Sequence, residues 1–170
     1  MRQLYPQSSW SVRAFVDAGQ EAKESKNTAE AFNFFRAAVG AYPARSETTP
    51  AQFELAWSAH EAKSYAEAAR LLIEHVASYA DKNTDFRGRA GYWAARDAER
   101  AGRLADARAL YEAMNVRYDA TWYGYLAQQR LAKMAGGGGA VVALDPSVDR
   151  AIANLKTVTF AEEAASGERL

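Results

Sequence analysis

A chain of 170 residues, of which 49% are apolar and 25% charged, is long enough for one domain with a substantial core and has an ordinary globular composition. Lysine and arginine (21) balance aspartate and glutamate (21), which removes the broad electrostatic attraction on which non-specific nucleic-acid binding depends. Cysteine is absent, which excludes disulfides, thiolate metal sites and a cysteine nucleophile, and no apolar run approaches the roughly 20 residues that span a bilayer.

The spacing of apolar residues predicts an all-α chain. In chain order we expect helices over residues 9–23, 29–41, 51–62, 65–79, 86–101, 104–118, 121–134 and 146–155. A weaker helical segment is expected from residue 160. Ser9 or Ser11 is the expected cap of the first helix, and Gly102 supplies the left-handed residue that ends the fifth. The four glycines at 136–139 predict a flexible joint, followed by a short apolar run packed as irregular chain.

One pattern of small and bulky apolar residues occurs three times along the chain. Each copy has an alanine where two helices are expected to cross: Ala31 in the first, Ala68 in the second and Ala107 in the third. The copies are 37 and 39 residues apart, a period that is typical of stacked helical hairpins. Alanine lets two antiparallel helices approach closely, and a bulky residue four positions later fills the gap between hairpins: Phe35, Leu72 and Tyr111. We therefore expect stacked antiparallel hairpins, because a single hairpin cannot bury its own apolar face.

The repeats define the expected organisation of the chain. Residues 1–135 form one repeat domain, in which the hairpins and a last helix occupy about 12–45, 50–83, 86–119 and 121–134. A glycine-rich linker follows at 136–145, and residues 146–170 form a further helical segment. The sequence leaves open whether this segment fills the groove of the repeats.

The third copy resembles the tetratricopeptide repeat in its aromatic, small and turn residues, which are Tyr92, Ala94, Ala95, Ala98, Gly102, Leu104, Ala107 and Tyr111. The first copy ends in Pro43, twelve residues after its key alanine, where that repeat places a closing proline. The second and third copies depart from the family, because they lack this proline and the spacing exceeds the usual period of about 34 residues. The resemblance implies a right-handed superhelix whose first helices line a concave face.

A more particular resemblance covers residues 86–134. Two segments carry it, Arg89-Ala90-Gly91-Tyr92-Trp93-Ala94-Ala95-Arg96 and Trp122-Tyr123-Gly124-Tyr125-Leu126-Ala127-Gln128-Gln129-Arg130-Leu131. They are similar to helices of the superhelix that precedes the catalytic domain in soluble lytic murein transglycosylases. The resemblance implies a periplasmic protein that engages a peptidoglycan strand or a partner protein, although the first residues lack the apolar stretch of a secretory signal.

In that family the chemistry belongs to a lysozyme-like domain that carries a Glu-Ser motif and a downstream glycine-rich stretch. This chain contains Glu24-Ser25, but nothing resembling the second stretch follows. The resemblance therefore implies that this chain is not an enzyme by itself. It would be a non-catalytic arm, ahead of a catalytic domain that the sequence does not contain.

The first helices of the hairpins carry the candidate ligand-binding residues, which are Phe53, Trp57, His60, Arg89, Tyr92, Arg96 and Glu99. Rings beside guanidinium groups suit an extended polar ligand, either a peptide or a glycan strand, because arginine holds carboxylates in a fork. The alternative is that Phe53, Trp57 and Tyr92 are ordinary packing between helices, as aromatic stripes at helical spacing usually are.

Neither a metal site nor catalytic chemistry is predicted. His60 and His75 are the only histidines and lack converging ligands, so we expect a structural or surface role for both, with no metal and no cofactor. Asp97 and Glu99 lie two positions apart on one helix and face different ways, which indicates a solvated surface rather than an acid–base pair. The spacing brings together no nucleophile, base and orienting group.

Two classes of function remain. The first is a non-catalytic superhelical arm of a peptidoglycan lytic transglycosylase, which engages cell-wall glycan or a partner protein. The alternative is a free-standing tetratricopeptide-type adaptor that binds a peptide segment in its concave groove. A clamp of the chaperone-binding type would need lysine and asparagine on the first hairpin, where Val16 and Gln20 stand instead.

Overall fold

The computed structural model describes residues 8–43, 45–79, 88–134 and 143–156. Within these ranges the chain is all-α, as the sequence predicts, and a short 3-10 helix (η1, Ser46–Thr48) leads into the third helix. The α-helices are α1 (Ser9–Glu24), α2 (Thr28–Ala41), α3 (Thr49–Glu61), α4 (Tyr65–Tyr79), α5 (Arg89–Arg100), α6 (Leu104–Tyr118), α7 (Trp122–Met134) and α8 (Pro146–Lys156). The joint expected at 136–139 and the weaker segment from residue 160 lie outside the described residues.

Local chemistry sets the helix boundaries close to the predicted ones. The cap of α1 is Ser8, whose hydroxyl accepts a hydrogen bond from the Trp10 amide at 3.2 Å. The predicted caps, Ser9 and Ser11, are wrong, because both residues lie inside the helix. The turn between α5 and α6 contains Gly102 at φ +79°, the left-handed conformation that the sequence predicts there.

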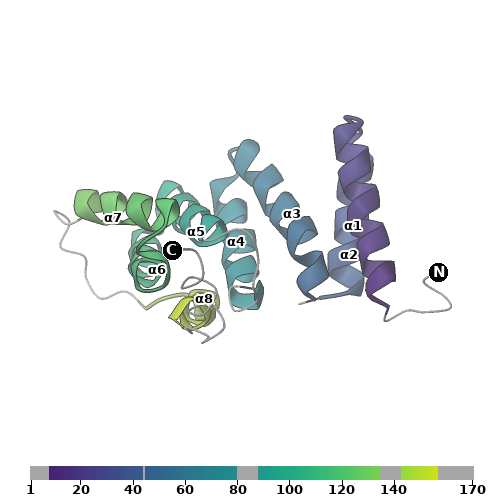
Figure 1. The fold of residues 1–170 in the computed structure, drawn as a ribbon. Helices are drawn as coiled ribbons and strands as arrows, with labels where there is room; N and C mark the ends of the chain where they lie inside the picture. The colour runs from purple at the N-terminus through teal and green to yellow at the C-terminus, as the bar shows by residue number, and fades with distance from the viewer. Residues whose placement is uncertain (1–7, 44, 80–87, 135–142, 157–170) are drawn as a thin grey trace.

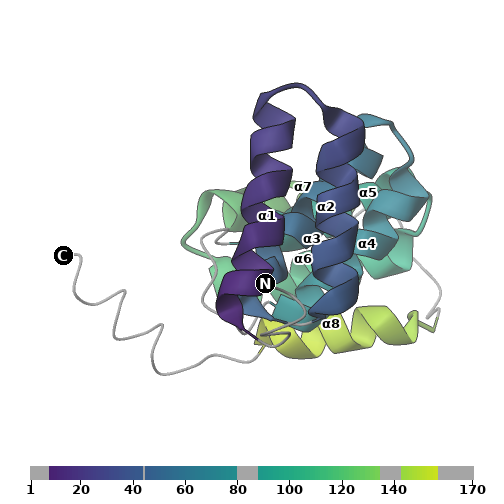
Figure 2. The same cartoon turned by 90° about the vertical axis from the view of Figure 1, so that its right-hand side faces the viewer.

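Figure 1 shows the helices in one row, from α1 and α2 at one end to α6 and α7 at the other. Helices that are adjacent in sequence pack against each other, both within the pairs α1–α2, α3–α4 and α5–α6 and between them. Figure 2 views the row from its α1–α2 end, where these two helices lie side by side. A small core joins α1, α2 and α3, and a larger core extends from α3 to α8.

The helices α3 and α5 lie parallel to each other. Near their starts, the guanidinium of Arg89 lies over the ring of Phe53, 4.5 Å from its centroid. Near their ends, His60 forms a hydrogen bond with Asp97, which follows it by 37 residues in the sequence. Contacts that join start to start and end to end require the two axes to run in the same direction.

The helices α5 and α7 are also parallel to each other. Near the starts of these helices the rings of Tyr92 and Tyr123 lie 5.8 Å apart, centroid to centroid. Near their ends Arg130 donates a hydrogen bond to Glu99, from which it is separated by 31 residues in the sequence. The helices α3, α5 and α7 therefore form one layer of parallel neighbours, and the site described below lies on this layer.

The alanines of the repeated pattern are buried to the same depth. Ala31 is 1% exposed, and Ala68 and Ala107 are 0% exposed. The bulky residues four positions later are also fully buried: Phe35, Leu72 and Tyr111. Each copy of the pattern thus places its small and its large side chain at matching depths in the core.

Replacing Ala68 with leucine is expected to lower the free energy of unfolding by about 1–3 kcal/mol, because the larger side chain overpacks a fully buried position. The matched control is Ala66→Leu on the exposed side of the same helix, which should change stability by less than about 0.5 kcal/mol. Urea denaturation of the two variants measures the difference. Equal stabilities would contradict the placement of Ala68 at a tight helix contact.

The helix α8 packs on α4 and α6, the second helices of two neighbouring pairs. Its buried residues recur at helical spacing and are Val148, Ala151 and Leu155. The side chain of Asn154 donates to the backbone carbonyl of Ala77 at the end of α4, and Arg117 of α6 donates to the Asn154 carbonyl at 3.4 Å. The described part of the tail, α8, therefore covers α4 and α6.

Candidate functional site

The seven candidate ligand-binding residues lie on two adjacent parallel helices. The first three belong to α3 and the other four to α5: Phe53, Trp57, His60, Arg89, Tyr92, Arg96 and Glu99. Phe53 and Tyr92 are only 2% and 7% exposed, so both are packing between helices, the alternative that the sequence offered for them. The other five are half-buried and reach the surface.

Two further residues of α5 belong to this surface and were missed by the sequence analysis. They are Trp93 and Arg100. In the order Arg89, Trp93, Arg96 and Arg100 the residues are spaced by four, three and four positions, which places all of them on one side of the helix. This spacing could have been found in the sequence. The alignment of the repeats instead placed Tyr92 on the concave face, but Tyr92 is buried in the core. We name this surface the aromatic–arginine face, and its residues are Trp57, His60, Arg89, Trp93, Arg96 and Arg100.

Arg89 anchors one end of the aromatic–arginine face. Its guanidinium lies 4.5 Å from the ring centroid of Phe53 and 5.1 Å from that of Trp57. These two rings are stacked, 5.9 Å apart and inclined by 13°. A guanidinium stacked on aromatic rings keeps its charge without losing the planar N–H edge that recognises carboxylates.

His60 occupies the centre of the face. Its ring stacks on Trp57 at 4.4 Å and 17°, and it meets Trp93 nearly edge-on at 4.6 Å and 68°. Its Nδ1 atom lies 2.8 and 3.0 Å from the two carboxylate oxygens of Asp97. The side chain is 13% exposed, so His60 is held on three sides and open on a small remaining part.

The prediction that Asp97 lies on a solvated surface is wrong. Its side chain is 0% exposed, and Arg100 contributes a second contact at 3.5 Å besides the hydrogen bond from His60. Burial raises the pKa of the Asp97 carboxyl above its ordinary value, and the hydrogen bond with His60 opposes this rise. Spacing along one helix could not reveal the partner, because His60 comes from the neighbouring helix.

Glu99 is the centre of a second polar cluster, beside the first. It accepts hydrogen bonds from the Tyr111 hydroxyl at 3.0 Å and from Arg130 Nε at 3.1 Å, and it pairs with Arg96 at 3.0 Å. Burial alone would raise the pKa of Glu99, but the hydrogen bonds from Arg130 and Tyr111 outweigh it and lower the pKa. Glu99 therefore fixes α5, α6 and α7 to one another.

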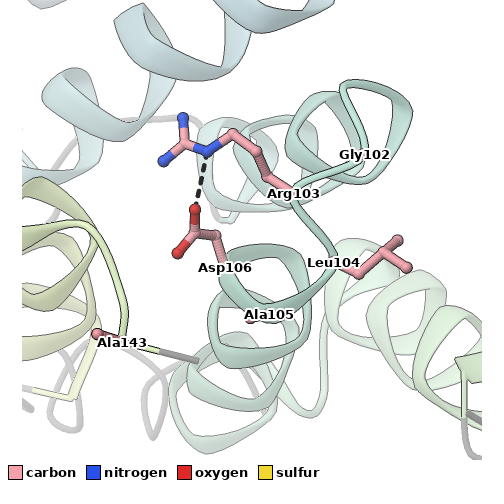
Figure 3. A pocket seen from close by; sticks show the side chains of 6 residues that line it. All are labelled: Gly102, Arg103, Leu104, Ala105, Asp106 and Ala143. Atoms are coloured by element: carbon pink, nitrogen blue, oxygen red, sulfur yellow. Dashed lines mark hydrogen bonds and ion pairs between the residues drawn. The ribbon is translucent and has the colours of Figure 1, made fainter. Parts of the chain in front are cut away.

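A hollow of about 330 Å³ lies outside the aromatic–arginine face, at the turn between α5 and α6. Figure 3 shows the side chains that line it, which are Gly102, Arg103, Leu104, Ala105, Asp106 and Ala143. Its charged groups bind each other, because Arg103 Nε donates to Asp106 at 2.8 Å. This arrangement offers a ligand little charge, so the hollow is the weaker candidate for a site.

Comparisons with protein-family models, with curated proteins and with solved structures gave no match. In its described residues the protein is all-helical, and its aromatic–arginine face lies on the parallel helices α3 and α5. Among the described residues, histidine and acidic side chains do not gather in the groups of three that would hold a metal ion. The described helices are also too short or too polar to cross a membrane.

Proposed function

We propose that this chain is a non-catalytic helical-repeat scaffold, built as a tetratricopeptide-like right-handed superhelix. Two observations support the repeat: the parallel packing of α3, α5 and α7, and the matching burial of Ala31, Ala68 and Ala107. The helices α4 and α6 are then the second helices of their hairpins, and α8 covers them.

The ligand site of this scaffold is the aromatic–arginine face. The observation that carries this proposal is the series of rings and guanidinium groups along two parallel helices, from the half-buried Arg89 to the exposed Arg100. Indole and imidazole rings provide surfaces on which sugar rings and peptide groups stack, and guanidinium groups bind carboxylates. The acidic residues Asp97 and Glu99 bind neighbouring side chains, which favours a binding role over an acid–base role.

The ligand that suits this face is a peptidoglycan strand, which combines sugar rings with carboxylate-bearing peptides. We propose that the chain is the superhelical arm of a periplasmic peptidoglycan lytic transglycosylase and that this face holds the strand. The Tyr92-Trp93 pair supports the proposal, since Trp93 lies on the face and Tyr92 beneath it contacts Tyr123 of the Trp-Tyr-Gly segment.

Calorimetric titration with a disaccharide–tetrapeptide fragment of peptidoglycan tests the proposal. Arg89→Gln should weaken binding about tenfold, the effect of losing one charge-assisted hydrogen bond. The matched control is Arg70→Gln, at an exposed arginine of α4 outside the face, and it should bind as the unmodified protein does. Tighter binding of acidic peptides than of the fragment would favour the peptide adaptor instead. The absence of binding to either ligand would refute the proposed site.

A further inference from the structure

The helix α7 is covered on fewer sides than the other two helices of the parallel layer. The helix α3 packs against α2 and α4, and α5 packs against α4 and α6, so each of them lies between two second helices of the row. Among the described elements α7 packs mainly against α6 and, to a smaller extent, against α5. One side of α7 is therefore open at the α6–α7 end of the row (Figure 1).

The open side of α7 carries four exposed residues, which we call the α7 seam: Trp122, Tyr125, Gln129 and Ala132. Their spacing of three, four and three positions places them on one face of the helix, as in the seam of a coiled coil. Trp122 is 66% exposed and Tyr125 48%, and the two rings stack on each other at 5.7 Å and 27°. All four side chains are uncharged. Aromatic residues without charged neighbours are typical of the core of a protein–protein interface.

The α7 seam is complementary in shape to a second copy of itself that runs in the opposite direction. Antiparallel pairing about the middle of the seam places Trp122 of one copy against Ala132 of the other, and Tyr125 against Gln129. The largest side chain then faces the smallest, and the tyrosine hydroxyl faces an amide that can bind it. A parallel pair would instead place Trp122 against Trp122 and Ala132 against Ala132, which crowds one end and leaves a gap at the other.

The charges beside the α7 seam favour the same orientation. Asp119 lies just before the start of α7 and Lys133 near its end, and both are exposed. Asp119 accepts a hydrogen bond from the Ala120 amide at 2.8 Å, and a carboxylate has further acceptor sites. In an antiparallel pair the end of one α7 lies beside the start of the other, so Lys133 of each copy approaches Asp119 of the other. A parallel pair would bring the two lysines together.

The row of helices already contains the antiparallel arrangement that this pair requires. A Cβ atom added at Gly91, near the start of α5, would meet the side chain of Met114, near the end of α6. The helices α5 and α6 therefore run in opposite directions. An antiparallel α7 from a second copy would cover α7 in the way that α6 covers α5.

We propose that the α7 seam is the contact of a symmetric homodimer, in which α7 of each copy covers the open side of α7 in the other. The two seams then form one isologous interface about a twofold axis. The inference is independent of the proposed ligand site, because the aromatic–arginine face lies on α3 and α5. Four side chains from each copy make a small contact, so the dimer belongs to the weak, reversible class.

Sedimentation velocity between about 10 μM and about 1 mM protein tests this proposal, because weak dimers dissociate within such a range. The unmodified protein should show a reversible equilibrium between monomer and dimer. Ala132→Glu should weaken the dimer at least about tenfold, since it places a charge against Trp122 of the other copy. Ala132 is exposed in the single chain, so the substitution leaves the fold intact. The matched control is Ala66→Glu at an exposed alanine of α4, which should dimerise as the unmodified protein does.

Lys133→Glu tests the antiparallel orientation. It should weaken the dimer by up to about fivefold, because it places a glutamate beside Asp119 of the other copy. Adding Asp119→Lys to the same chain should restore the dimer, and a double variant that stays weaker would overturn the orientation.

The remaining outcomes decide whether a second copy covers the α7 seam at all. A monomer at every concentration would overturn the proposal, and so would a dimer that Ala132→Glu leaves unchanged. A monomer in which the disaccharide–tetrapeptide fragment changes the fluorescence of Trp122 would also overturn it, because a sugar would then cover the seam. The change would be assigned to Trp122 by its loss in Trp122→Phe.

Discussion

Replacing Gly124 with alanine is expected to destabilise the protein by about 3 kcal/mol. A Cβ atom at this position would lie 1.8 Å from the backbone oxygen of Tyr118 and 3.2 Å from the Cα atom of Asp119. The oxygen cannot yield easily, because it accepts hydrogen bonds from both the amide and the hydroxyl of Thr121, at 3.0 and 2.8 Å. The clash therefore exceeds the gain of about 1 kcal/mol that alanine brings to a helix.

Gly40 provides the matched control, since it lies within α2 and a Cβ atom there would meet nothing within 4 Å. Gly40→Ala should stabilise the protein by about 0.5–1 kcal/mol, the ordinary difference between these residues in a helix. Urea denaturation of both variants gives the two free energies. Equal stabilities of Gly124→Ala and Gly40→Ala would show that Gly124 does not lie in close contact with the backbone of Tyr118.

This turn gives a physical reason for the Trp-Tyr-Gly sequence at residues 122–124. Thr121 closes the turn through its bonds to Tyr118 and accepts a hydrogen bond from the Gly124 amide at 3.1 Å. Gly124 is then required by the close approach of the two helices, and Tyr123 packs on Tyr92 of α5. The Trp-Tyr-Gly segment is therefore explained by packing within this chain.

Most helices could be predicted from the sequence, because local signals define them. Apolar spacing placed α4 and α6 at their observed bounds, and Gly102 marked the turn before α6. The position of α8 could not be predicted in the same way. The spacing of Val148, Ala151 and Leu155 indicates an apolar stripe, but a stripe does not reveal which helices it packs against.

The candidate site was predictable only in part, for the same reason. Single-helix spacing identifies the stripe of α5 that contains Arg89 and Arg96. Asp97 was expected in solvent because its only visible neighbours were those of its own helix. Its partner, His60, lies 37 residues earlier, and only the parallel packing of α3 and α5 brings the two together.

Lowering the pH from 7 to 5 is expected to remove about 2 kcal/mol of stability through His75 alone. His75 is buried at 3% exposure between Phe53 and Tyr79, and its Nδ1 atom has no hydrogen-bond partner. Burial lowers the pKa of His75 from 6.5 to about 4, because the charged form loses its hydration. The unfolded chain therefore binds the proton first, so stability present above pH 6.5 is lost as the pH falls towards 4.

His75→Leu isolates this effect, because leucine has a similar size, suits a helix and does not titrate. At pH 7 the variant should be more stable than the unmodified protein by about 1 kcal/mol, since a buried nitrogen without a partner is removed. At pH 5 its advantage should grow to about 3 kcal/mol, while all other titrating groups contribute equally to both proteins. An advantage that stays constant between pH 7 and pH 5 would show that His75 is hydrated in the folded state and that the helices around it pack less tightly.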